Sequence, residues 1–188
     1  VPCSQVMKTY LTYGFAMAMC GAVLGMALYF LGFNSDVSKL EISRWISGIV
    51  GVAIAVGCIL LGMREKRELT PVDQTWGYGS AFVTGFLIGL IGTVLSAIFN
   101  YAYFAYIDPN LSDLVYQMQV SKMEAKGMSA DQIEKIEPMM RKFIGPVAMT
   151  ISGLVGGLVF NTVISLITAA FVKNRSEPPA AAPAAPAA

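Results

Sequence analysis

Residues 75–107 read TWGYGSAFVTGFLIGLIGTVLSAIFNYAYFAYI and contain no Asp, Glu, Lys, Arg or His. A helix needs roughly 20 apolar residues to cross the hydrocarbon core of a bilayer, which is about 30 Å thick. Because this uncharged run is longer than that, it predicts a membrane-spanning helix. The fold of the chain then depends on what packs around this helix.

Small residues recur at every fourth position of this run, at Ala81, Gly85, Gly89, Thr93 and Ala97. Residues four apart lie on one face of a helix. In lipid the hydrophobic effect does not drive helices together, and small-residue faces let two backbones approach closely. The pattern therefore predicts that this helix packs tightly against other helices.

The composition is that of a membrane protein. Of its 188 residues, 55% are apolar and 13% are charged, whereas soluble domains have about 25% charged residues. A net charge of +1 gives no concentrated basic surface, so we expect no nucleic-acid partner. The chain has no histidine, which is the commonest general base and imidazole metal ligand. We predict that the protein is not an enzyme and that it has no cofactor or metal site.

Three further apolar runs, at residues 11–33, 45–63 and 146–172, predict membrane-spanning helices. The polar residues 34–44 are expected to link the first two, and Trp45 opens the second as an interfacial anchor. Each run has small or polar residues at the spacing of a packing face. The expected packing residues are Gly21 and Gly25 in the first run, Ser47, Gly51 and Ala55 in the second, Ala81, Gly85, Gly89 and Thr93 in the third, and Gly153, Gly157, Asn161 and Ser165 in the fourth.

Turn signals bound the third span. Thr70 and Pro71 have the pattern of an N-cap and a first helical residue, so we expect the third helix to begin there and to protrude, tilt or break near Gly77 and Gly79. Asp108-Pro109 is expected to end it.

The extramembrane segment 108–145 has the periodicity of two short amphipathic helices. Lys126-Gly127 separates them, Ser129 and Gln132 form a capping box, and Pro138 is expected to kink or divide the second helix. Neither helix is long enough to span a membrane, so both are expected to lie on its surface or to cover the end of the bundle.

The predicted domains are an N-terminal segment (1–10), an all-α domain of four transmembrane helices (11–175) and a disordered Pro/Ala-rich tail (176–188). Four crossings place both termini on one side of the membrane, together with the charged residues 64–68. Basic residues adjoin the ends of spans on this side, where the positive-inside bias acts most strongly, so we expect the termini to be cytoplasmic. These residues are Arg64, Lys66, Arg67, Lys173 and Arg175.

A family resemblance rests on the order of these features. An apolar hairpin and a basic turn precede YAYFAYIDPN (101–110), KMEAKGMSADQIEKIEPMMRKF (122–143) and a last span that ends in KNR. Between Met7 and Arg175 the chain resembles the bacterial membrane proteins grouped as domain of unknown function 4199. The resemblance implies four transmembrane helices, an extracytoplasmic segment between the third and fourth, and a bacterial inner-membrane location. It implies no activity.

Two functions are compatible with this sequence. The first is an accessory or scaffolding subunit that packs through its small-residue faces against other membrane protein subunits or a second copy, within membrane lipid. The alternative is a small-solute carrier or channel, although no charge lies inside the spans as ion-coupled carriers usually require. Asn161 is either an interhelical hydrogen-bonding residue or part of a polar solute site. Solute flux that disappears in Asn161→Leu would favour the carrier, and a bundle with no water-accessible cavity would argue against it.

Overall fold

The computed structural model describes residues 3–71 and 76–172, with side chains from Met7 onward. These residues form six α-helices and one π-helical turn, and they contain no strand. The elements are α1 (Cys3–Phe30), α2 (Val37–Leu69), α3 (Tyr78–Ala102), η1 (Tyr103–Ile107), α4 (Leu111–Ala125), α5 (Ala130–Ile144) and α6 (Pro146–Val172). Helices α1, α2, α6 and α3, the last continued by η1, are each long and apolar enough to cross a membrane. The predicted all-helical architecture is therefore confirmed.

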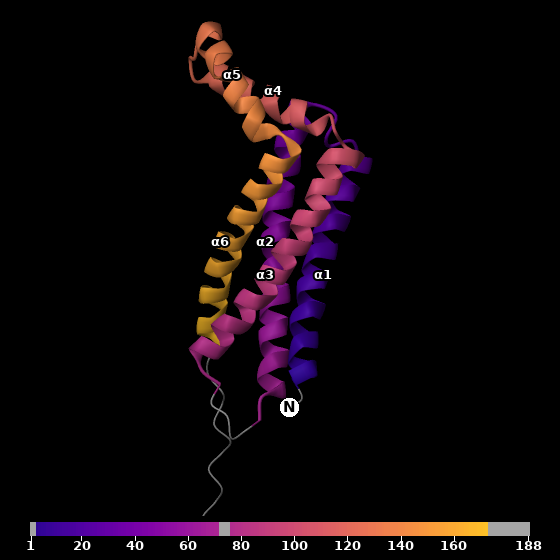
Figure 1. Ribbon diagram of the computed structural model, residues 1–188, viewed down its shortest axis with the longest axis vertical. Coiled ribbons are helices and arrows are strands. Elements are labelled where there is room, and N and C mark those ends of the chain that lie inside the picture. Colours follow the sequence, from indigo (N-terminus) through magenta and orange to yellow (C-terminus); the bar gives the residue numbers. More distant parts are fainter. Residues whose placement is uncertain (1–2, 72–75, 173–188) are drawn as a thin grey trace, which may run out of the picture.

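The four long helices lie side by side, with α4 and α5 at one end of the bundle and the N-terminus at the other (Figure 1). Helices α2 and α3 each contact all three other long helices, and the contact between α3 and α6 is the most extensive. The end of α2, the start of α3 and the end of α6 lie at the N-terminal end (Figure 1). The chain thus passes along the bundle four times.

The first connection differs from the sequence prediction. Helix α1 ends at Phe30, earlier than residue 33, because Gly32 adopts a φ of 73°. The Phe33 amide donates to the Leu28 carbonyl at 3.0 Å, and the Gly32 amide donates to the Tyr29 carbonyl at 2.9 Å. These two bonds form a Schellman motif, whose left-handed residue is usually glycine.

Helix α2 begins at Val37 rather than at Trp45, so most of the predicted polar linker is helical. Asp36 is its N-cap, and the carboxylate accepts a hydrogen bond from the Lys39 amide at 2.9 Å. The helix has 33 residues and is therefore about 50 Å long, which exceeds the thickness of a hydrocarbon core. Residues 37–44 and 64–69 form the two parts that extend beyond the apolar run.

The start of α3 also differs from the prediction. Thr70 is the C-cap of α2, Pro71 is not helical, and Gly77 is the N-cap of α3. At the other end, the Asp108 amide donates to the Tyr103 carbonyl at 2.9 Å, which closes the π-helical turn η1, and the helix stops at Asp108 as predicted.

The two short helices have the predicted caps. Gly127, with a φ of 84°, ends α4, and the Ser129 amide donates to Gln132 Oε1 at 3.1 Å at the start of α5. Pro138 lies inside α5 and does not divide it. Leu111 and Val115 of α4 are buried against the end of the bundle, whereas α5 extends away from it (Figure 1).

Two clusters form the hydrophobic core. The larger one includes Ile59, Met63 and Ile88, which are fully buried between the long helices toward the N-terminal end. The smaller one joins α4 to the end of the bundle and includes Tyr103 and Met118. Between these clusters the bundle is hollow. The predicted disordered tail lies outside the described residues.

Candidate functional site

The small-residue faces of α3 and α6 meet along one seam. A Cβ added to Gly89 would lie 2.8 Å from Asn161 Cβ, and one added to Gly157 would lie 2.9 Å from Thr93 Cγ2. A Cβ added to Gly85 would lie 2.9 Å from Ser165 Oγ. These separations are too short for a real Cβ, so the two helices approach this closely only because glycine stands at these positions. Ala81 is fully buried and continues the same face.

The remaining expected packing residues lie where the helices are further apart. At Gly21, Gly25, Gly51 and Gly153, no neighbouring heavy atom lies within 4 Å of an added Cβ. The close helix approach expected at these four glycines is therefore not found. They instead line one or both of two cavities between the long helices, together with Ser47 and Ala55.

The two cavities adjoin each other in the half of the bundle near α4. One, of about 430 Å³, lies between α1, α2 and α3, and the other, of about 600 Å³, lies mainly between α2, α3 and α6. Their shared lining residues are Gly21, Ser47, Ser96, Asn100, Phe104 and Met149. Gly48 and Gly153 are exposed at the edge of the second cavity, which opens between α2 and α6.

Asn161 carries a buried, unpartnered oxygen at the second cavity. Its Nδ2 donates to Thr93 Oγ1 at 2.8 Å, and the Thr93 hydroxyl donates to the Gly89 carbonyl at 2.7 Å. The predicted interhelical hydrogen bond is therefore present. Asn161 is only 7% exposed, yet its Oδ1 has no hydrogen-bond partner. Leaving a buried acceptor unpaired costs about 1–3 kcal/mol, and this oxygen is enclosed by protein atoms although Asn161 as a residue lines the cavity.

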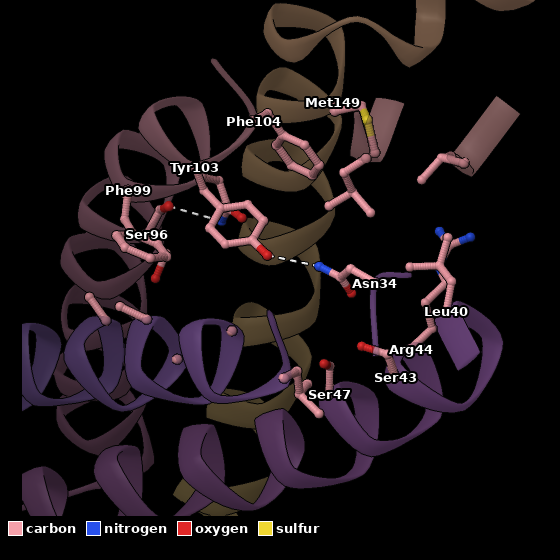
Figure 2. A pocket seen from close by; sticks show the side chains of 18 residues that line it. Asn34, Leu40, Ser43, Arg44, Ser47, Ser96, Phe99, Tyr103, Phe104 and Met149 are labelled. Atoms are coloured by element: carbon pink, nitrogen blue, oxygen red, sulfur yellow. Dashed lines mark hydrogen bonds between the residues drawn. The ribbon is translucent and has the colours of Figure 1, made fainter. Parts of the chain in front are cut away.

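Arg44 is the one charged residue among those that line the two cavities. Figure 2 shows it beside Ser43 and Leu40 in the first cavity. Its Nη1 lies 3.8 Å from Met118 Sδ, a weak acceptor, and it has no ion pair among the described residues. The neighbouring Glu41 instead pairs with Lys122 at 3.0 Å. The cavity therefore has an exposed cation that no described carboxylate pairs with.

A hydrogen-bond network closes the α4 end of the first cavity. Asn34 Nδ2 donates to the Tyr103 hydroxyl at 2.8 Å, shown in Figure 2, and lies 3.2 Å from Asp108 Oδ2. These contacts attach the α1–α2 turn to the end of α3. Among the described side chains, no group of three or more His, Cys, Asp or Glu could hold a metal ion.

A family model described as protein of unknown function (DUF4199) matches residues 12–174. The chain belongs to the DUF4199 family. The resemblance noted in the sequence is thereby confirmed, and the match includes both cavities and most of the four long helices. No curated protein and no solved structure matches the chain significantly.

Three of the predicted topology residues are described in this DUF4199 protein. Arg64, Lys66 and Arg67 lie in the last two turns of α2, at the end of the bundle where the N-terminus lies (Figure 1). Lys173 and Arg175 lie outside the described residues. The segment between α3 and α6 lies at the opposite end (Figure 1).

Sequence reasoning missed the contributions of Arg44, Asn34 and Tyr103 to this DUF4199 cavity. Arg44 was expected in a linker because the second span was placed from Trp45 onward. The signal for a longer helix was present, because Asp36 is a good N-cap residue and Leu40, Arg44 and Ser47 follow helical spacing. No comparable signal in the sequence indicated that residues from three different helices would line one cavity.

Proposed function

We propose that this DUF4199 protein is a non-catalytic membrane protein that binds a small anionic solute in the two adjoining cavities and acts as its carrier. The observation that supports this most is their polar lining. Ser43 and Ser47 on α2, Asn100 on α3 and Asn161 on α6 surround a hollow that the helices do not fill. A bundle whose only role was packing would gain from filling that space with apolar side chains.

The preference for an anion rests on Arg44. No carboxylate lines either cavity, whereas the Arg44 guanidinium lies at the first with only a sulfur as its polar contact. Attraction between opposite charges is stronger where protein and lipid reduce the effective dielectric constant. An arginine also binds carboxylates and phosphates in a bidentate manner. A small carboxylate, sulfonate or phosphate fits this chemistry.

The shape of the two cavities supports solute access from the α4 half of the bundle. The cavities end where Ile59, Met63 and Ile88 fill the bundle toward its N-terminal end. They are accessible near α4 and between α2 and α6, where Arg44 and Gly153 are exposed. A carrier alternates the access to one site, so transport requires the closed half to open while the α4 half closes.

Binding is tested by measuring the Tm of the purified protein in detergent with added butyrate, benzenesulfonate or inorganic phosphate. Choline is the cationic comparator, and all samples have the same ionic strength. A ligand that binds only the folded state stabilises it by about 2.7 kcal/mol at one hundred times its Kd. We expect at least one anion, and not choline, to raise the Tm. Arg44→Gln should abolish the rise, because it removes the charge and keeps much of the side-chain volume.

Lys135→Gln is the matched control, because it removes one positive charge from exposed α5. Proteoliposome flux of the stabilising anion should disappear in Asn161→Leu. Since Asn161 also bonds Thr93, Gly51→Leu provides a second variant that fills the cavity from a position with free space. Anion effects that persist in Arg44→Gln, or flux that persists in both cavity variants, would overturn the proposal.

An accessory or scaffolding role is the second candidate, and exposed glycines on α6 favour it. Gly153 and Gly156 have no neighbour within 4 Å of an added Cβ. Such small residues permit close approach by a helix of another membrane protein subunit or of a second copy. A stoichiometric partner that copurifies in mild detergent would favour this role. A monodisperse monomer that binds the anion would favour the carrier.

We further propose a bacterial inner-membrane location with cytoplasmic termini. Arg64, Lys66 and Arg67 directly follow the apolar part of α2, where basic residues favour the cytoplasmic side. With this orientation the anion site faces the extracytoplasmic side.

A further inference from the structure

A second binding surface lies on the lipid-facing side of the bundle, toward its N-terminal end. Helices α2 and α6 form a groove of about 660 Å³. It shares Val52 and Phe160 with the second cavity, but neither Arg44 nor Asn161 lines it. Leu60 of α2 and Val163, Ile167 and Phe171 of α6 contribute to its apolar walls. Phe171 is 80% exposed, and Val163 and Ile167 are also exposed, so the groove is open to lipid.

Two arginines line the same groove. Arg64 and Arg67 are three residues apart on α2 and therefore lie on one face of the helix. Neither makes an ion pair with any described residue. The one other polar lining residue, Thr168, donates its hydroxyl to the Ile164 carbonyl at 2.8 Å, so it offers no free donor.

The two described acids on the same helix end, Glu65 and Glu68, do not neutralise the two guanidinium groups. Glu65 accepts a hydrogen bond from the Thr9 hydroxyl at 2.9 Å, which directs its carboxylate toward α1. Glu68 is exposed and forms no ion pair with either arginine. No carboxylate lines the groove. The groove thus combines apolar walls along two spans with two positive charges at the membrane end of α2 that have no ion-pair partner among residues 3–71 and 76–172.

We propose that this groove holds an anionic phospholipid, with one acyl chain between α2 and α6 and the phosphate at Arg64 and Arg67. The apolar walls match an acyl chain, and the arginines match a phosphate in charge and hydrogen-bonding geometry. Basic pockets between transmembrane helices are known binding sites for anionic headgroups. The lipid would cover the space between α2 and α6 and stabilise the contact between them.

The proposal is tested by native mass spectrometry of the full chain in detergent with added phosphatidylglycerol or phosphatidylcholine. We expect one phosphatidylglycerol to bind more tightly than phosphatidylcholine. Each arginine near a headgroup contributes about fivefold in affinity, so Arg64→Gln with Arg67→Gln should remove most of this preference. The same double change should leave phosphatidylcholine binding nearly unchanged.

Two further variants separate a specific site from diffuse attraction. Lys135→Gln with Lys142→Gln removes the same charge from α5 at the opposite end of the molecule and should keep the preference. Val163→Trp fills the groove and keeps both arginines, so it should weaken phosphatidylglycerol binding by a similar factor. Since Val163 is exposed, this change should not prevent folding.

The outcomes decide between occupants. A preference that survives the arginine changes, or that both charge variants lose equally, would overturn the proposal. So would a dimer that Val163→Trp abolishes and phosphatidylglycerol does not displace, since a second copy would then occupy the groove. Loss of lipid preference with anion binding at Arg44 intact would support this site independently of the proposed carrier function.

Discussion

Single glycines determine how closely α3 and α6 approach. A Cβ on Gly89 would lie 2.8 Å from Asn161 Cβ, an atom too near the backbone to move aside without shifting α6. The approach brings Asn161 Nδ2 within 2.8 Å of Thr93 Oγ1. The close packing and the interhelical hydrogen bond therefore both depend on the absence of a side chain at Gly89.

We predict that Gly89→Ala destabilises the protein. Overpacking a closely packed site typically costs about 1–3 kcal/mol. This cost should exceed the gain of about 1 kcal/mol from replacing glycine by alanine in a helix. The measurement is the Tm of the purified protein in detergent, which should fall.

Gly153→Ala is the matched control for that experiment, because Gly153 lies on the same seam face of α6 with no atom within 4 Å of an added Cβ. Its Tm should stay the same or rise. Equal losses in both variants would mean that the α3–α6 approach does not depend on Gly89.

At the scale of helices, backbone capping determines where each element begins and ends. Gly32 and Gly127 both have positive φ and end α1 and α4 with the same pair of hydrogen bonds. Asp36 starts α2 seven residues before Ser43, so that Ser43 and Arg44 lie on a helix and reach the cavity. The cap thus determines part of the site.

The Asp36 cap predicts a pH dependence for the start of α2. The hydrogen bond from the Lys39 amide, with that from Ser38, holds the pKa of the Asp36 carboxyl below its ordinary value. The stabilisation is present above the pKa of the unfolded chain and is lost as the pH falls through the lower pKa of the folded protein. Amide hydrogen exchange of residues 37–41 should therefore accelerate, relative to a variant that cannot titrate, as the pH falls below about 4.

Asp36→Asn serves as that variant, because asparagine is an equally good N-cap and carries no charge. The ratio of exchange rates between the two proteins, taken at each pH, removes the intrinsic effect of pH on exchange. A ratio that stays constant as the pH falls below about 4 would show that the carboxylate does not stabilise α2.

At the scale of the whole molecule, the bundle is tightly packed in one half and hollow in the other. Helices α3 and α6 meet near the N-terminal end and separate toward α4 (Figure 1). Near the N-terminal end, Met63 and Ile88 fill the space between the helices, while near α4 small residues face one another across the cavities. The asymmetry leaves a polar site accessible from one end.

This arrangement predicts opposite labelling of the two ends. In a variant without native cysteines, Lys126→Cys should react with a membrane-impermeant maleimide in intact spheroplasts. Arg67→Cys should react only after permeabilisation, because the charged end of α2 is expected in the cytoplasm. Reversed labelling would overturn the proposed orientation, and labelling of both sites in intact spheroplasts would exclude the single crossing by α3 that separates them in this fold.

Hydropathy, helical periodicity and capping residues are local properties, and they were enough to predict the helical fold, the four long helices, the end of α3 at Asp108 and the caps around Gly127 and Ser129. The start of α2 was mispredicted because its first two turns are polar, so hydropathy did not extend the helix to Asp36. The small-residue faces indicated that helices could approach, but glycines of the same spacing behave differently at Gly89 and at Gly153. That difference arises from the angle between α3 and α6, which depends on all their contacts together. The second cavity, which Asn161 lines, lies where α3 and α6 separate, and the first cavity, which Arg44 lines, depends on how α1, α2 and α3 pack. Both therefore required the three-dimensional structure.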